Sequence, residues 1–169
     1  LASSAASDVY KRQGLSLLLY PTVSDYINSL HQSEAIAGYS EAIDNVDAEQ
    51  RDAILENAQK YNAALAERGN MWKLDNEQLA DYNSQLSITG TDVMSYIDIP
   101  SINCTLPIYH GTDEAVLQIA VGHLEGTSLP VGGESSHCVL SGHRGLPSAK
   151  LFTDLDRLVE GLSLIHISE

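Results

Sequence analysis

The chain has 169 residues, of which 9 are basic and 23 acidic, and its formal net charge is −14. This length fits one domain with an appendage and is sufficient for a buried core. Such an acidic surface would repel phosphate backbones, which argues against nucleic-acid binding. Cys104 and Cys138, its two cysteines, lie in apolar segments without CxxC spacing, so neither a disulfide framework nor a zinc site is indicated. We interpret both as small buried thiols.

The two ends of the chain are expected not to be natural protein sequence. Residues 8–13 can be encoded by a DNA string that is the reverse complement of one encoding residues 162–167. This inverted relation resembles the adaptor ends of a transposon-based sequencing library, and exogenous segments are excluded from fold reasoning. We therefore expect residues 1–13 and 162–169 to be adaptor translations and the natural protein to continue beyond both ends. The alternative is a polar tail and a last short strand. Residues 14–161 keep a net charge of −14.

An apolar run occupies residues 14–23. It is too short to span the roughly 30 Å hydrocarbon core of a bilayer. Because it begins where the first suspected adaptor ends, we interpret it as the remnant of a transmembrane helix, with Tyr20 as an interfacial aromatic residue. An ordinary N-terminal hydrophobic helix and a signal-peptide remnant are the alternatives.

Residues 24–89 are predicted to form a helical N-terminal region with a possible lid. Up to residue 68 the composition is rich in Ala, Glu, Gln and Asn, which favours helix. Apolar residues recur at three- and four-residue spacing, with a break and a new cap at residues 44–47 and an end at Gly69, which predicts a helical hairpin. The predicted apolar stripes are Tyr26, Ile27, Leu30, Ile36, Tyr39 and Ile43 in the first helix, and Ile54, Leu55, Ala58, Tyr61 and Leu65 in the second.

The polar stretch from residue 70 to residue 90 holds the only tryptophan, Trp72, and is weakly helical over residues 77–82. A connector of this length beside a compact domain is often a lid or a binding loop. Simple packing of Trp72 on the domain is an equally good interpretation.

After Gly90 the composition changes to strands and turns. Residues 93–99 and 104–109 are predicted to pair as a hairpin or meander. Pro107 would place the second strand at an edge or a bulge. A short helix capped by Asp113 is expected to follow. Further along, a glycine-rich loop is predicted over residues 122–133 and an amphipathic helix over residues 147–158.

The most informative stretch is residues 137–147, His-Cys-Val-Leu-Ser-Gly-His-Arg-Gly-Leu-Pro. An aliphatic run followed by Gly-His-Arg-Gly predicts a buried strand that stops abruptly and presents His143 at its rim. Side chains alternate faces along a strand, so Cys138 and His143 would point to opposite sides, roughly 16 Å apart. Cys138 is therefore not the expected partner of His143.

Three segments, residues 98–112, 122–133 and 137–147, together resemble the front half of class C sortases, the pilin-polymerising sortases of Gram-positive bacteria. The resemblance is almost continuous from the apolar run to residue 158. It implies an α+β, mainly β fold, in which an N-terminal helical hairpin precedes a sortase-type β-barrel that is incomplete here over residues 90–161.

The resemblance also implies cysteine transpeptidation by an enzyme that is anchored in the cell membrane, faces outward and uses no cofactor. A thiolate would attack the Thr–Gly bond of an LPxTG-like sorting signal on a pilin, and a lysine amine of the next pilin would resolve the thioester. By motif match, His143 is the family's catalytic histidine. The family's nucleophile, in a later Thr-Leu-x-Thr-Cys strand, and its catalytic arginine, in the strand after that, have no counterpart here. We assign neither role to the cysteines and arginines that lie elsewhere in this part of the chain, which are Cys104, Cys138, Arg144 and Arg157.

The chemistry of His143 makes sense without the family. A free thiol with a pKa near 8.5 is mostly protonated at neutral pH, and a nearby imidazolium both lowers that pKa and can protonate a leaving amine. An arginine could stabilise the oxyanion. Between residues 70 and 90 there is no Asp-Pro-aromatic lid motif of the kind that class C enzymes usually carry.

Three other interpretations stay open. A non-catalytic, surface-anchored binding or scaffold barrel would keep the front half of a sortase and lack its nucleophile. A Cys104–His143 dyad of another hydrolase would need the first hairpin to pair beside the His143 strand. A metal site is disfavoured, because only His137 and His143 share a predicted face and they lie roughly 20 Å apart. His110 and His123 are interpreted as hydrogen-bonding groups that hold the glycine-rich turn.

Overall fold

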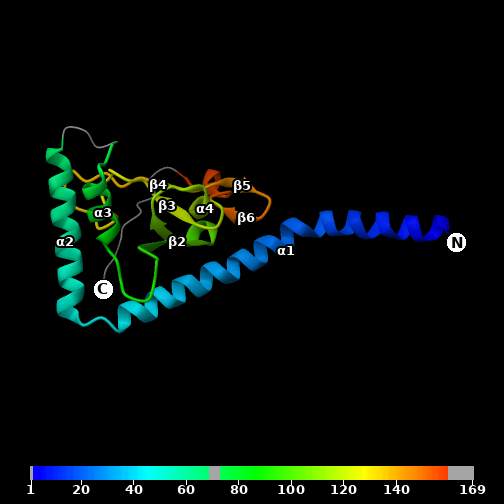
Figure 1. Cartoon of the computed structure of the whole chain (residues 1–169), viewed down its shortest axis with the longest axis horizontal. Helices are drawn as coiled ribbons and strands as arrows, with labels where there is room; N and C mark the ends of the chain where they lie inside the picture. The colour runs from blue at the N-terminus through cyan, green and yellow to red at the C-terminus, as the bar shows by residue number, and fades with distance from the viewer. Residues whose placement is uncertain (1, 69–72, 160–169) are drawn as a thin grey trace.

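The computed structural model describes residues 2–68 and 73–159, and Figure 1 shows a long N-terminal helix that leads into a group of helices and short strands. The elements in chain order are α1 (Ala2–Asp44), α2 (Ala48–Glu67), α3 (Asn76–Ser84), β1 (Ser95–Ile99), the 3-10 helix η1 (Pro100–Ile102), β2 (Cys104–His110), α4 (Glu114–Leu117), β3 (Val121–His123), β4 (Leu140–Ser141), β5 (Arg144–Leu146), β6 (Ala149–Leu151) and the 3-10 helix η2 (Leu155–Arg157).

The strands form a four-stranded sheet in the order β1-β2-β3-β4 and a separate two-stranded hairpin, β5-β6. β1 and β2 are antiparallel, β2 and β3 are parallel, and β3 and β4 are antiparallel. The mixed α+β class predicted from the sequence is confirmed. Within the described ranges the two sheets do not close into a barrel.

The first predicted hairpin is confirmed, with Ile99 opposite Cys104 across a turn that contains η1. β2 nevertheless lies inside the sheet, between β1 and β3, and is not an edge strand. Pro107 is tolerated there because the pairing of β2 with β3 begins only at Ile108. The missing N–H of Pro107 therefore interrupts no part of the β2–β3 ladder.

The two predicted N-terminal helices are confirmed. They are separated by residues 45–47, where the Asp47 carboxylate accepts a hydrogen bond from the Gln50 backbone N–H at 2.7 Å and caps α2. α2 turns away from α1 instead of lying along it (Figure 1). Its predicted apolar face is buried, with Ala58, Tyr61 and Leu65 in the core.

The apolar stripe predicted for the first helix is wrong in its first half. Tyr26, Ile27 and Leu30 are 63%, 46% and 50% exposed. The half-buried side chains on that part of α1 are polar instead and include Asp25, Asn28 and Gln32. They face the domain because their partners there are backbone N–H and C=O groups, which need hydrogen bonds when they lie under a helix.

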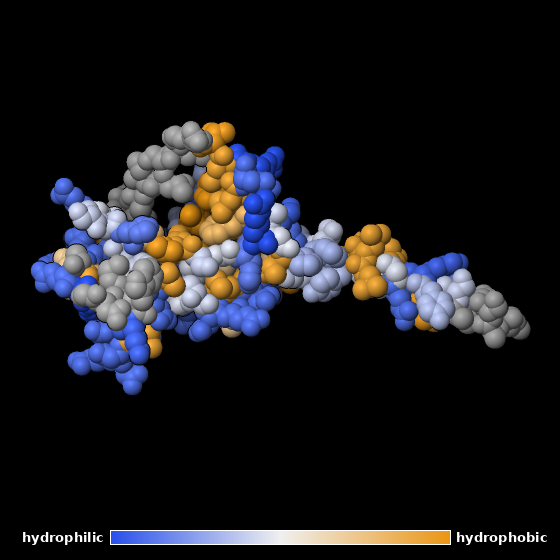
Figure 2. Space-filling view, turned by 90° about the horizontal axis from the view of Figure 1, so that it is seen from above, coloured by the Kyte–Doolittle hydropathy of each residue, from blue (hydrophilic) through white to orange (hydrophobic). Residues whose placement is uncertain are grey.

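The N-terminal half of α1 projects beyond the rest of the protein, and the space-filling view shows apolar surface on it (Figures 1 and 2). Exposed apolar side chains there include Leu15, Leu17, Leu18 and Leu19. Pro21 lies inside α1, where its ring removes a backbone donor and favours a kink. Across residues 2–68 and 73–159, no helix carries an apolar stretch long enough to cross a bilayer.

The amphipathic helix predicted for residues 147–158 is wrong. Residues 144–151 form the β5-β6 hairpin, in which Arg144 pairs with Leu151, and only η2 is helical beyond it. Ala149 and Leu151 are buried while Lys150 between them is exposed, which is the alternation of a strand. The leucine spacing indicates a helix because Leu151 in β6 is buried and Leu155 in η2 is partly buried against the same core, although the two residues belong to different elements.

The strand expected to reach His143 is also shorter than predicted. β4 contains two residues, and residues 137–139 run beside the glycine-rich loop, where the Leu124 N–H donates to the Val139 carbonyl at 2.9 Å. The weak helix near residue 80 is confirmed as α3, whose Asp75 and Gln78 form a capping box. Trp72, the other feature of that stretch, lies outside the described residues.

Candidate active site around His143

His143 lies between β4 and β5, where the main sheet ends and the hairpin begins, and its side chain is half-buried. Its backbone carbonyl accepts a hydrogen bond from the Phe152 N–H at 3.1 Å. A side chain at Gly142 would place its Cβ 2.7 Å from Cδ2 of the Phe152 ring. Glycine is therefore required there for Phe152 to pack beside the backbone of His143.

The hairpin after His143 is fixed from both sides. Gly145, at a φ of +76°, donates its N–H to Thr153 Oγ1 at 3.0 Å. Arg144 forms an ion pair with Asp156 at 2.9 Å. Because both charged side chains are more than half exposed, this pair contributes about 1 kcal/mol or less. The rigidity of the His143 segment thus comes mainly from Phe152 and the β5-β6 pairing.

Neither cysteine has the environment of a nucleophile. Cys104 is 7% exposed, and its thiol lies 3.8 Å from the Leu151 carbonyl oxygen as a weak donor. Burial raises the pKa of the Cys104 thiol, and burial raises the pKa of Cys138 to about 11. Reactive cysteines have depressed pKa values and access to solvent. In addition, β4 pairs with β3 and not with the first hairpin, so the pairing that a Cys104–His143 dyad needs is not found.

A buried polar network centred on Tyr82 holds α3 against the sheet. The Tyr82 hydroxyl accepts the Gly111 N–H at 3.0 Å and lies 3.0 Å from both His123 Nδ1 and the His123 carbonyl oxygen. His123 Nε2 faces the Ser128 carbonyl at 2.9 Å. A carbonyl only accepts, so we assign the ring proton to Nε2. Burial lowers the pKa of His123 and keeps its ring neutral.

This network agrees with the role expected for His123, which holds the glycine-rich loop through Ser128. His110 instead binds the end of α3, where its Nε2 lies 2.8 Å from the Gln85 carbonyl. Sequence reasoning missed Tyr82, which is completely buried. In the part of the chain that the structure describes, no three His, Cys, Asp or Glu side chains are grouped as metal ligands would be.

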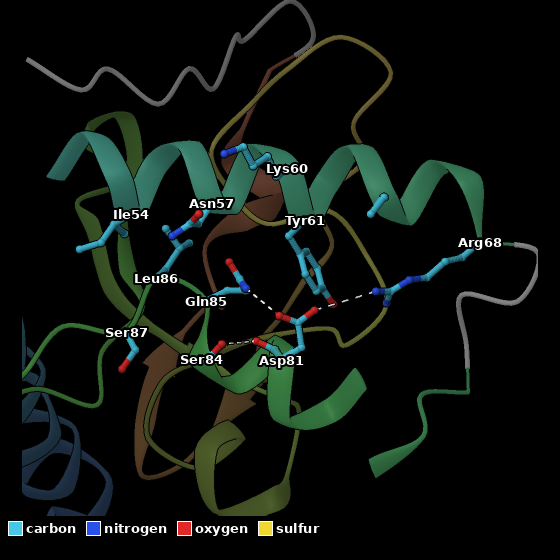
Figure 3. Close-up of a pocket in the computed structure, with 11 residues that line it drawn as sticks. Ile54, Asn57, Lys60, Tyr61, Arg68, Asp81, Ser84, Gln85, Leu86 and Ser87 are labelled. Carbon is cyan, nitrogen blue, oxygen red and sulfur yellow. Dashed lines mark hydrogen bonds and ion pairs between the residues drawn. The ribbon is translucent and has the colours of Figure 1, made fainter. Parts of the chain in front are cut away.

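A separate polar cavity of about 360 Å³ opens between α2 and α3 (Figure 3). In it the guanidinium carbon of Arg68 lies 5.5 Å from the centre of the Tyr61 ring, and Arg68 Nη2 lies 3.9 Å from Asp81 Oδ2. Figure 1 places α2 and α3 at the opposite end of the domain from the β5-β6 hairpin. The cavity is therefore distinct from the surroundings of His143.

Comparison with known proteins identifies the fold. The sortase domain family matches residues 97–167, a range that includes His143. Among solved structures, sortase C1 from Streptococcus agalactiae is 49% identical, with a TM-score of 0.72, over 76% of this chain and 66% of that one. Sortase C from Streptococcus pneumoniae is 36% identical, with a TM-score of 0.65, over 76% and 64%. No match was found among curated proteins.

The chain belongs to the sortase family. Within that family its solved neighbours are mainly class C sortases, which confirms the resemblance noted in the sequence. A lid mutant of sortase A from Corynebacterium diphtheriae is also similar, at 39% identity and a TM-score of 0.61 over 68% of this chain and 62% of that one. The chain spans just under two thirds of the length of these structures.

Proposed function

We propose that the complete protein is a cysteine transpeptidase of the class C sortase type. It would join pilin subunits through LPxTG-like sorting signals, with a pilin lysine as the acceptor. The observation that carries this proposal is the 49% identity to sortase C1 of Streptococcus agalactiae over 76% of the chain. The related Streptococcus pneumoniae sortase C is described in terms of its pilin substrate specificity.

In this proposal His143 is the catalytic histidine. His143 lies at the junction of β4 and β5, is half-buried and has its backbone carbonyl held by the Phe152 N–H. These features support the proposal, because the imidazole ring then reaches solvent from a fixed backbone position. A protonated imidazole there would stabilise a thiolate and donate a proton to the leaving amine. The reaction balances without a cofactor, because the thiolate displaces one amine and the lysine amine then displaces the thiolate.

The nucleophile in this proposal is neither Cys104 nor Cys138, since burial raises the pKa of both thiols. We assign the role to the Thr-Leu-x-Thr-Cys strand that the family resemblance leads us to expect after residue 161. We further propose that the protein is anchored in the cell membrane with its domain on the extracellular face. The exposed leucines on the projecting part of α1 support an apolar environment for that segment.

The test is to incubate the complete gene product with an LPxTG peptide and to look by mass spectrometry for an acyl-enzyme thioester. We expect one modified cysteine, located outside residues 104 and 138, and we expect His143→Ala to abolish its formation. A Cys104→Ala variant serves as the control and should still form the thioester. The burial of Cys104 and the partial burial of Cys138 also favour a second candidate, a non-catalytic surface-anchored binding barrel. That candidate gains support if the complete protein forms no thioester and binds the peptide reversibly.

A further inference from the structure

One face of α1 meets the domain through three polar side chains, Asp25, Asn28 and Gln32. Their spacing places them on the same side of the helix. Each side chain forms a hydrogen bond with a backbone group of the domain. Asp25 Oδ1 accepts the Lys150 N–H at 2.8 Å, Asn28 Nδ2 donates to the Ser148 carbonyl at 2.7 Å, and Gln32 Nε2 donates to the Ile119 carbonyl at 2.7 Å.

Two of these bonds hold the β5-β6 hairpin. Ser148 lies in its turn, and Lys150 is the central residue of β6. Lys150 stands between the two paired positions of β6, where the backbone groups of an antiparallel strand point away from the partner strand. Its N–H therefore needs an acceptor other than β5, and Asp25 supplies it. The ion pair between the same side chains, at 3.9 Å and with Lys150 76% exposed, adds little.

The hairpin in turn fixes His143. Phe152 follows β6 directly, donates its N–H to the His143 carbonyl at 3.1 Å and packs against Gly142. The Asp25 side chain on α1 thus holds the Lys150 N–H, the chain continues from Lys150 to Phe152, and the Phe152 N–H holds the His143 carbonyl. The hydrogen bonds of Asn28 and Asp25 to the hairpin join residues that are 120 and 125 positions apart in the sequence.

We propose that Asp25 and Asn28 are positioning residues for His143. By holding Ser148 and Lys150, they set the position of the hairpin and, through Phe152, the place of the imidazole. Gln32 makes the same kind of bond from the same face of α1 but holds Ile119, which precedes β3, so it does not share this role. This inference rests on the proposed catalytic role of His143.

The first test measures peptide cleavage by the complete protein. We expect Asp25→Ala and Asn28→Ala to lower kcat on the order of tenfold with little change in KM, because small displacements of a catalytic group are costly. Asp25→Asn should restore most of the rate, since an amide oxygen still accepts the Lys150 N–H. Gln32→Ala is the matched control, and its kcat should equal that of the wild type.

The second test needs no activity and uses amide hydrogen exchange in the present chain. Asp25→Ala should speed exchange at Phe152, and Gln32→Ala should leave it unchanged. Equal exchange at Phe152 in Asp25→Ala and in the wild type would overturn the positioning role. So would an unchanged kcat in both alanine variants while His143→Ala is inactive. If His143→Ala keeps full activity, the proposed role of His143 fails instead, whatever the exchange result.

Discussion

Replacing Tyr82 with Phe tests whether the buried hydroxyl network holds α3 to the sheet. The substitution keeps the ring, which lies 5.2 Å from the ring of His110 and is completely buried, so packing changes little. It removes the only acceptor that the structure gives the Gly111 N–H among its described residues and one partner of His123 Nδ1. Leaving a buried donor unsatisfied costs about 1–3 kcal/mol.

Taking about 2 kcal/mol as the loss, we expect the melting temperature to fall by about 4–8 °C for a domain of this size. The assay is thermal unfolding monitored by circular dichroism. Urea denaturation checks the result, and the dependence of the free energy of unfolding on urea concentration should be the same in the variant and the wild type. Tyr26→Phe is the matched control, because Tyr26 is 63% exposed and its substitution should change stability by less than about 0.5 kcal/mol. A melting temperature of Tyr82→Phe within about 1 °C of the wild type would refute the reasoning.

Three further predictions concern the two thiols, the buried His123 and the glycine before His143. Cys104 and Cys138 should react slowly with iodoacetamide at pH 8 and rapidly in urea, because burial raises both pKa values; fast labelling of the folded chain would contradict this. Burial lowers the pKa of His123 below its ordinary 6.5. As the pH falls, this side chain therefore takes up a proton in the unfolded chain before it does so in the folded chain. The free energy of unfolding should then decrease as the pH drops below about 6.5. Melting curves at pH 7.5 and 5.5 test this, and we expect the lower melting temperature at pH 5.5. A higher melting temperature at pH 5.5 would contradict the prediction. Gly142→Ala should displace the Phe152 ring and destabilise the protein by about 1–3 kcal/mol, the usual cost of overpacking, as urea unfolding would show.

The elements that could be predicted are those whose signals are local. The β1–β2 hairpin follows from alternating side chains and the stop at Pro100, and α3 follows from the Asp75–Gln78 capping box. The placement of His143 just after a strand of the main sheet was also predictable, although that strand is only two residues long. Each of these features depends on neighbours within a few positions of the chain.

What could not be predicted depends on contacts between distant segments. Tyr82 sits in a weak helical pattern, and nothing near it indicates that its hydroxyl meets His123, 41 positions away. Asp25 was missed for a related reason, since hydrophobic periodicity assumes that the buried face of a helix is apolar. The surface of the domain that α1 covers instead presents backbone N–H and C=O groups. Residues 147–158 carry a leucine spacing that indicates a helix, because Leu151 in β6 and Leu155 in η2 both contact the core from different elements.

The most direct test of the central claim is the rate of LPxTG peptide cleavage by the complete protein and three variants at pH 7.5. Our account predicts that His143→Ala loses activity, whereas Cys104→Ala and Cys138→Ala keep rates near that of the wild type. Loss of cleavage in either cysteine variant, with an unchanged melting temperature, would contradict the account, because that thiol would then be the nucleophile. Full activity in His143→Ala would contradict it equally.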